Sequence, residues 1–134
     1  MAEYLVTGAA GFIGAALAER LLADGHRVTG VDNLNDAYDR RLKEWRLARL
    51  RRESRFTFHA VDIADRPSLE AALGSTAFEA IFNLAARAGV RASLKMPETY
   101  FDTNVHGALN VLELARARKI PKMVQASTSS LYGA

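Results

Sequence analysis

The sequence of 134 residues contains no cysteine and no long apolar run. Without cysteine there can be no disulfide scaffold, no thiolate metal site and no cysteine nucleophile, and we expect no metal centre. No apolar run approaches the roughly 20 residues that a membrane-spanning helix needs. The first residues also lack the basic and apolar segments of a secretory signal. We therefore expect a cytoplasmic protein without a membrane partner.

An excess of charge of one sign is confined to a single segment. The chain has 18 basic and 15 acidic residues, whereas residues 39–55 alone hold eight basic and three acidic ones. A basic stretch can bind nucleic acid or an anionic ligand. No helix-turn-helix, zinc pattern or interleaving of aromatic and basic residues accompanies it. We interpret it as a solvated helix that buries Leu42, Trp45 and Leu50, and we expect no nucleic-acid partner.

Apolar runs alternate with helical stretches along the whole chain. The apolar runs predict strands at 4–7, 27–31, 56–61, 79–84 and 122–127. The intervening stretches predict helices at 12–24, 37–53, 67–73 and 98–118. In the first helix Ile13, Leu17 and Leu21 share one face, and in the last helix Val105, Leu109 and Leu112 are expected to point inward.

This alternation predicts an α/β fold with a parallel sheet covered on both faces. Right-handed crossovers make it a Rossmann-like, doubly wound sheet with the strand order 3-2-1-4-5. There are no repeats or low-complexity linkers, so residues 1–134 form one domain. We expect the sheet to be truncated after strand five, and an unpaired edge invites pairing with another chain. We therefore expect a homodimer or other self-association through that edge.

A glycine-rich segment lies between the first strand and the first helix. Gly8, Gly11 and Gly14 are spaced three residues apart, with Phe12 and Ile13 at the start of the helix. Glycines allow a tight turn and a close approach of the backbone to a diphosphate, and the helix N-terminus offers free N–H groups. The pattern predicts a dinucleotide site. A purely structural role of the glycines in turn and packing is the alternative.

An acidic residue, Asp32, ends the second strand. A carboxylate there accepts hydrogen bonds from the adenosine ribose and repels a 2′-phosphate, which favours NAD over NADP. The alternative is NADP, with Arg40 or Arg41 reaching the extra phosphate.

Two further strand ends predict contacts with the cofactor. Asp62 can accept from the adenine amino group with Ile63 against the ring, although a simple strand-end turn also explains this pair. The small residues that follow the fourth strand leave room for a cofactor, and they are Leu84, Ala85 and Ala86.

Six segments then combine in one order, namely residues 7–14, 31–36, 62–63, 83–86, 104–107 and 127–133. In these segments the chain resembles the extended short-chain dehydrogenase/reductase family, in its nucleotide-sugar epimerase/dehydratase branch. Segments 32–39, 42–44, 46–50 and 88–94 are similar to UDP-glucuronate 4-epimerases. The resemblance adds Asn33, Asn35 and Asn104 to the residues near NAD. For Asn104 an ordinary helical position is the alternative.

The resemblance implies oxidation of a UDP-sugar at C4 by NAD, followed by reduction on the other face of the 4-keto sugar. Thr128 would hold the reacting hydroxyl, and Ser127, Ser129 and Ser130 would flank the sugar. The family's Tyr-x-x-x-Lys pair is absent from the 134 residues. The chain therefore looks like the first half of an epimerase, which we expect to bind NAD without turning over by itself.

The same serines bear on the type of reaction. The family's 4,6-dehydratases carry an Asp-Glu pair, and its uronate decarboxylases a glutamate, where this chain has Ser129 and Ser130. A UDP-glucuronate-like 4-epimerase is therefore favoured over both. A non-catalytic NAD-binding module is the remaining alternative, because it also lacks the Tyr-x-x-x-Lys pair.

Overall fold

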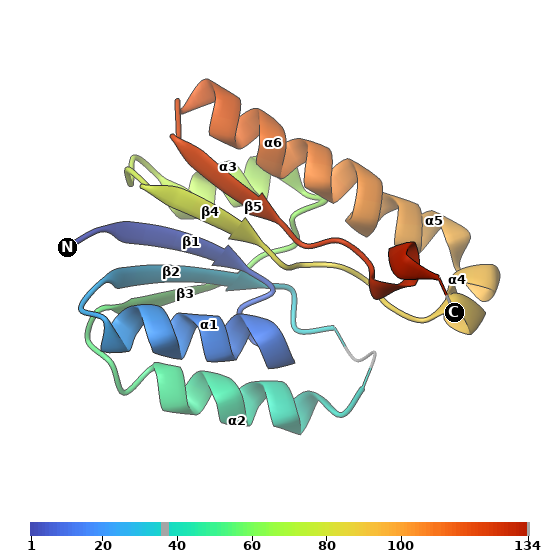
Figure 1. Cartoon of the computed structure of the whole chain (residues 1–134), viewed down its shortest axis with the longest axis horizontal. Coiled ribbons are helices and arrows are strands. Elements are labelled where there is room, and N and C mark those ends of the chain that lie inside the picture. Colours follow the sequence, from blue (N-terminus) through green and yellow to red (C-terminus); the bar gives the residue numbers. More distant parts are fainter. Residues whose placement is uncertain (36–37, 134) are drawn as a thin grey trace.

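The computed structural model describes residues 1–35 and 38–133. Five parallel strands form one sheet in the order β3-β2-β1-β4-β5, and their arrows point the same way in Figure 1. The strands are β1 (Glu3–Thr7), β2 (Arg27–Asp32), β3 (Phe56–Ala60), β4 (Ala80–Asn83) and β5 (Lys122–Gln125). The predicted strand order is confirmed.

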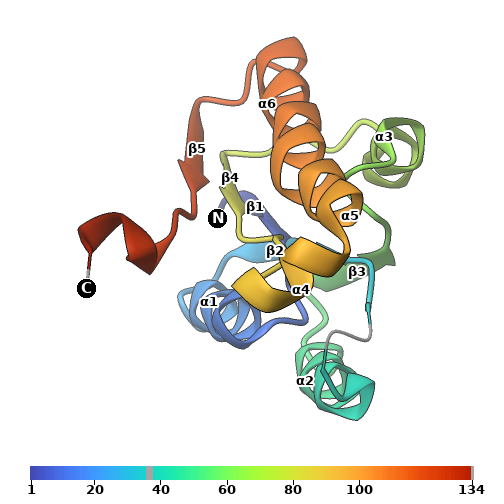
Figure 2. The same ribbon diagram turned by 90° about the vertical axis from the view of Figure 1, so that its right-hand side faces the viewer.

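Helices cover both faces of the sheet, as Figure 2 shows. Helices α1 (Phe12–Ala23) and α2 (Arg40–Leu50) lie on one face, and α3 (Arg66–Leu73) and α6 (Ala108–Ala117) lie on the other. The predicted helix at 37–53 was too long at its carboxyl end, and its predicted first residue, Ala37, lies outside the described residues, as does Asp36. The fourth and fifth strands are also shorter than predicted.

The long helix predicted at 98–118 is a composite of three segments. It runs through α5 (Pro97–Phe101), a π-helical segment η1 (Asp102–Gly107) and α6. The prediction missed two short elements, α4 (Val90–Lys95) and the 3₁₀ turn η2 (Ser129–Tyr132). A π-helical segment inside an α-helix is rare and frequent at functional sites, and this one contains Asn104.

The core consists of two apolar clusters, one on each face of the central strand β1. Successive side chains of a strand point to opposite faces, so Val6 packs under α1 and α2 while Leu5 packs under α3 and α6. Leu22 and Leu47 belong to the first cluster. The two clusters fix the helices against the sheet and align the carboxyl ends of the strands.

The prediction of which residues of η1 and α6 point inward was wrong. Val105, Leu109 and Leu112 are each about half exposed, with relative accessibilities of 52%, 51% and 52%. The buried residues of this stretch include Gly107 and Val111. A side chain at Gly107 would come within 2.7 Å of Ile63 Cγ1, so close packing selects the small residue and turns the larger side chains outward.

In helices α1 and α2, too, the residues that face the core differ from those that the sequence predicts. Ile13 is 66% exposed, because the small residues Gly14, Ala15 and Ala18 face the sheet instead. In α2 Leu50 is buried as predicted, whereas Leu42 and Trp45 are exposed. The other buried residues of α2 are Leu47 and, unexpectedly, Lys43.

Candidate functional site

A cavity of about 460 Å³ opens at the carboxyl ends of the strands. Its lining residues end or follow all five strands, so it includes the point between β1 and β4 where the strand order changes direction. Parallel α/β sheets bind ligands at such switch points. All predicted cofactor-binding residues except Asn104 line this cavity, and they are Gly8, Gly11, Phe12, Ile13, Gly14, Asp32, Asn33, Asn35, Asp62, Ile63, Leu84, Ala85 and Ala86.

The glycine loop is shaped by its own backbone contacts. Gly8 has φ +69°, and a side chain there would come within 2.9 Å of the Leu84 carbonyl group. A side chain on Gly14 would lie only 2.0 Å from the Gly8 carbonyl oxygen. Two of the glycines are therefore required by the fold itself, so the structural role considered above is real. It is compatible with a ligand-binding role.

The loop also presents backbone donors at the start of α1. Within the described residues, no side chain caps this end of the helix, and the N-cap position is Gly11. The first N–H groups of a helix have no partner inside it, and they carry a partial positive charge. Since Phe12, Ile13 and Gly14 line the cavity, this helix end is suited to hold an anionic ligand.

Asp32 lies at the end of β2 and is 8% exposed. Its Oδ2 accepts a hydrogen bond from the Ala10 N–H at 3.1 Å, and its Oδ1 accepts one from the Leu34 N–H at 2.8 Å. Leu34 adopts a left-handed conformation with φ +55°, a strained state for leucine. This turn directs the Leu34 N–H onto the carboxylate. Both oxygens are oriented by backbone groups, and each retains a lone pair for a further donor.

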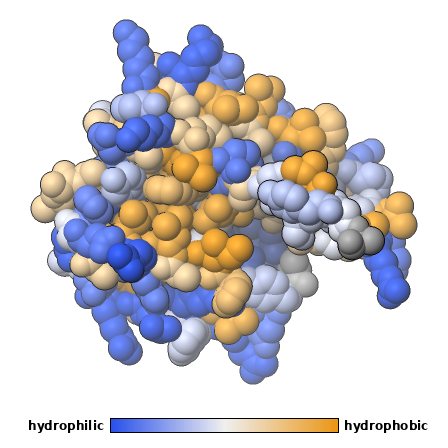
Figure 3. Space-filling model, in the orientation of Figure 1, coloured by the Kyte–Doolittle hydropathy of each residue, from blue (hydrophilic) through white to orange (hydrophobic). Residues whose placement is uncertain are grey.

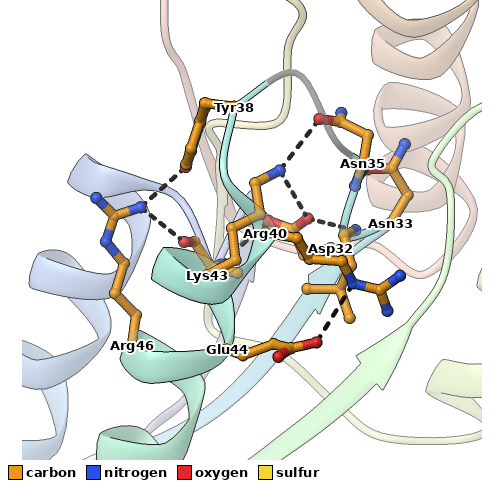
Figure 4. A network of polar contacts seen from close by, with 10 residues as sticks. Asp32, Asn33, Asn35, Tyr38, Arg40, Lys43, Glu44 and Arg46 are labelled. Carbon is orange, nitrogen blue, oxygen red and sulfur yellow. Dashed lines mark hydrogen bonds and ion pairs between the residues drawn. The ribbon is translucent and has the colours of Figure 1, made fainter.

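A lysine that the sequence analysis missed lies beside this carboxylate (Figure 4). The Lys43 ammonium is 3.8 Å from Asp32 Oδ1 and donates a hydrogen bond of 3.2 Å to Asn35 Oδ1. It also lies 5.1 Å from the centre of the Tyr38 ring. Lys43 is only 5% exposed and lines the cavity.

The two arginines considered for NADP are engaged elsewhere. Arg40 pairs with Glu44 at 3.4 Å, as Figure 4 shows, and Arg41 pairs with Asp39 at 2.7 Å. The Arg41 guanidinium and backbone N–H hold the pKa of Asp39 below its ordinary value. In the part of the chain that the structure describes, neither arginine lines the cavity.

The opposite wall of the cavity follows β4. The Thr7 hydroxyl accepts hydrogen bonds from the backbone N–H groups of Leu84 and Ala85 at 3.0 and 3.1 Å, and it donates to Asn83 Oδ1. Asn83 in turn donates to Gln125 Oε1 at 2.8 Å. This chain of bonds ties β1, β4 and β5 together where they end and fixes the small residues that line the cavity.

Asn104 acts on the cavity indirectly. Its Oδ1 accepts from the Arg87 N–H at 2.7 Å, and its Nδ2 donates to the Arg87 carbonyl at 2.9 Å. Arg87 lines the cavity, and its Nε is a buried donor for which the described residues offer no partner. Asn104 thus acts as a clamp, because its two hydrogen bonds hold the backbone of Arg87 at the wall of the cavity. An ordinary helical position, the alternative for Asn104, does not account for these bonds.

The Asp62 carboxylate makes the strand-end turn considered above, because its Oδ1 accepts from the Ala64 N–H at 2.9 Å. Asp62 nevertheless lines the cavity together with Ile63, which is 3% exposed. The two readings of this pair are compatible.

The predicted sugar-binding residues lie next to the cavity but do not line it. They follow β5, and Ala126 is the lining residue of this segment. Thr128 is exposed and caps η2, its Oγ1 accepting from the Ser130 N–H at 3.1 Å. Ser127, Ser129 and Ser130 are exposed as well. Figure 2 shows this segment extending away from α4 and α5, and the sugar-binding roles stay predictions.

The described residues lack two other kinds of functional feature, a membrane-spanning helix and a metal-binding cluster. No described helix is long and apolar enough to cross a membrane. The same residues contain no group of three or more side chains able to hold a metal ion.

The sequence is similar to those of known sugar-nucleotide enzymes over only part of their length, and two such relatives are named as a UDP-glucuronate 4-epimerase or a probable one. UDP-glucuronate 4-epimerase of Thermodesulfobacterium geofontis is 51% identical over 98% of this chain and 41% of its own length. A probable UDP-glucuronate 4-epimerase of Rhizobium meliloti is 47% identical, over 98% of this chain and 39% of that protein. The chain thus spans about two fifths of the relatives that it matches.

Solved structures show the same similarity. A UDP-glucuronic acid 4-epimerase variant from Bacillus cereus, in complex with NAD and a fluorinated UDP-sugar, matches with a TM-score of 0.86 and 35% identity, over 98% of this chain and 41% of that one. UDP-glucose-4-epimerase of Stenotrophomonas maltophila with bound NAD matches with a TM-score of 0.84 and 31% identity, over 99% and 39%. The family model described as GDP-mannose 4,6 dehydratase matches residues 5–134. This chain therefore belongs to the GDP-mannose 4,6 dehydratase family.

Proposed function

We propose that this chain is the NAD-binding portion of a nucleotide-sugar 4-epimerase whose substrate is UDP-glucuronate or a similar UDP-sugar. The observation that carries the proposal is the Asp32 carboxylate, buried at 8% exposure and oriented by two backbone donors beside the glycine loop. Relatives named UDP-glucuronate 4-epimerase at 51% and 47% identity support the choice of reaction.

The residues of the cavity fit NAD along its length. The N-terminus of α1 offers donors to the diphosphate, and Asp32 accepts from the ribose hydroxyls. Asp62 and Ile63, which line the same cavity, contact the adenine in this proposal. The unpartnered Nε of Arg87 is a buried donor that an anionic group would satisfy. When bound, NAD supplies the reversible two-electron oxidation of a sugar carbon.

The chain's own contribution to the reaction is binding and orientation. Thr128 holds the hydroxyl of the reacting sugar carbon, and the hydroxyls of Ser127, Ser129 and Ser130 contact the sugar and its carboxylate. The sequence places no carboxylate at positions 127–130, so the acid and base that eliminate water in a 4,6-dehydratase have no counterpart there. This supports epimerisation over dehydration or decarboxylation.

Calorimetric titration of the 134-residue chain with NAD tests the binding. We expect saturable binding, and we expect Asp32→Asn to weaken it about tenfold or more, because hydrogen bonds to a charged group contribute about 1.5–3 kcal/mol. Asp24→Asn is the matched control, since Asp24 lies at the far end of α1 and pairs only with Arg20 among the described residues. A folded chain that does not bind NAD, or equal dissociation constants for both variants, would contradict the proposal.

An assay of UDP-glucuronate epimerisation tests the second part. The sequence contains no Tyr-x-x-x-Lys pair to move the hydroxyl proton. We therefore expect NAD binding without turnover by this chain alone. Turnover by the purified chain would overturn that expectation and leave the binding proposal intact.

A further inference from the structure

Lys43 is a buried cation for which the proposed function gives no role. We propose that Lys43 is a positioning and specificity-determining residue of the NAD site, which sets how strongly the site discriminates NAD from NADP. The inference rests on the proposed NAD binding and deepens it. No other lysine of the described chain is buried.

The burial of Lys43 is unusual for its residue type. Lysine is almost never fully buried unless its charge is paired, and here its side chain is 6% exposed opposite an Asp32 side chain that is 7% exposed. The reason lies in α2, which buries Leu47 and Leu50 in the core and thereby brings Lys43, one turn earlier, to the cavity. The helix thus delivers a positive charge to the predicted ribose site.

The distances around the Lys43 ammonium leave it able to donate hydrogen bonds to a ligand. It carries three donors, and one of them bonds to Asn35 Oδ1 at 3.2 Å. The separation of 3.8 Å from Asp32 Oδ1 is an ion pair, but it exceeds the length of a direct hydrogen bond. A ribose hydroxyl that donates to this carboxylate can therefore accept a hydrogen bond from the ammonium.

The charges of Asp32 and Lys43 are expected to have opposite effects on the choice between NAD and NADP. Asp32 repels a 2′-phosphate, whereas an ammonium 3.8 Å away attracts it. Arg40 and Arg41 are exposed and paired with Glu44 and Asp39. Lys43 is thus the cation of the described residues that lies nearest to the predicted ribose carboxylate. Selectivity for NAD is the net effect of two opposed charges, and Lys43 keeps it below what Asp32 alone would impose.

The test compares dissociation constants for NAD and NADP by calorimetry in the 134-residue chain. We expect Lys43→Gln to weaken NAD binding about fivefold and NADP binding at least about twenty-fivefold, so that the NADP to NAD ratio of dissociation constants rises about fivefold or more. Lys43→Arg retains the charge and should keep the ratio within about twofold of the unaltered chain. Lys95→Gln, on the exposed helix α4, is the matched control and should change neither constant.

A second pair of variants keeps the test valid if Lys43→Gln does not fold. Lys43→Gln leaves a buried carboxylate unpaired, which is destabilising, whereas Asp32→Asn with Lys43→Gln removes both charges together. Asp32→Asn alone should bind NADP more tightly than the double variant does, because only the single variant keeps the cation. Thermal melts establish which variants are folded.

The outcomes separate the two proposals. If the unaltered chain binds NAD but the ratio is the same in folded Lys43→Gln, or the same in Asp32→Asn and the double variant, Lys43 has only a structural role and the inference is wrong. If the folded chain binds neither dinucleotide, the proposed function fails first and the inference fails with it.

Discussion

At the scale of single residues, Gly14 is constrained by the fold before any ligand is considered. A Cβ on Gly14 would lie 2.0 Å from the Gly8 carbonyl oxygen, whereas a Cβ on Gly11 would lie 3.1 Å from the same atom. The obstacle is backbone, which cannot swing aside as a flexible side chain does. The first contact is impossible without moving α1 or the loop, and the second requires a shift of a few tenths of an ångström.

We expect Gly14→Ala to lower the free energy of unfolding by about 3 kcal/mol or more, at the upper end of the cost of overpacking. Gly11→Ala has the same added methyl group in the same loop and should cost about 1 kcal/mol or less. Urea unfolding monitored by circular dichroism measures both. Equal losses for the two variants would contradict the expected difference between the two positions.

At the scale of elements, the π-helical segment η1 is joined to the loop after β4 through one side chain. Asn104 bonds both the N–H and the carbonyl of Arg87, and the Tyr100 hydroxyl donates to the Ala88 carbonyl at 2.7 Å. Two consecutive residues of the cavity wall are therefore held by the composite helix. The order of this wall depends on a contact between segments far apart in the sequence.

We expect Asn104→Ala to loosen this wall and to lower the free energy of unfolding by only about 1–2 kcal/mol, since it removes two exposed hydrogen bonds. Hydrogen exchange at the Arg87 amide should become about tenfold faster, because a loss of about 1.4 kcal/mol in local opening corresponds to that factor. His106→Ala, at another exposed position of η1, is the control and should leave that amide unchanged. Unchanged exchange in Asn104→Ala would show that the clamp is not what orders the loop.

The N-cap residue of helix α3 is Asp65, whose carboxyl group can titrate. Asp65 accepts hydrogen bonds from the Ser68 hydroxyl at 2.6 Å and from the Ser68 N–H at 3.2 Å. These bonds lower the pKa of Asp65 below its ordinary value of 3.8. A carboxylate with a lowered pKa stabilises the folded state above its ordinary pKa, and that contribution disappears as the pH falls through 3.8 and below.

We therefore expect unaltered chain and Asp65→Asn to differ in stability by a constant amount near neutral pH and by a decreasing amount as the pH falls below 3.8. Asparagine is the appropriate comparison, because it also caps helices but carries no titrating proton. Thermal melts across this range measure the difference. A difference that grows toward acid would contradict the assigned direction.

At the scale of the whole molecule, the face of the sheet that carries α1 and α2 has no described helix over β4 and β5. In Figure 1 α1 and α2 lie beside β2 and β3, whereas no helix lies in front of β4 and β5. Apolar side chains gather over the middle of this face (Figure 3). Val124 on β5 is 50% exposed, and within the described sheet β5 pairs only with β4. An open edge beside an apolar face favours association.

We expect the chain to self-associate in a concentration-dependent manner, as analytical ultracentrifugation would detect. Val124→Lys should shift the equilibrium toward monomer, because a charge on an edge strand opposes pairing. Leu94→Lys, which replaces an apolar residue of 78% exposure on α4, is the control and should leave the equilibrium unchanged. Identical sedimentation of all three chains at every concentration would show that this edge does not mediate association.

Much of the architecture follows from local patterns in the sequence. The alternation of strands and helices, with right-handed crossovers, predicts a doubly wound parallel sheet, and the observed order β3-β2-β1-β4-β5 is a common order of such sheets. The glycine loop and Asp32 could be recognised because the loop directly follows one strand and Asp32 ends the next. The carboxyl ends of neighbouring parallel strands meet at one edge, so these residues converge in any sheet of this order.

Only the tertiary structure decided which helix faces point inward and which charges are buried. The apolar spacing of Val105, Leu109 and Leu112 is equally compatible with an inward and an outward face, and the close approach of Gly107 to Ile63 chooses between them. The ion pair of Lys43 with Asp32 likewise requires α2 to be docked on the sheet, across 11 positions of chain. Local spacing specifies the elements and their order, but burial depends on contacts between distant segments, which no single segment encodes.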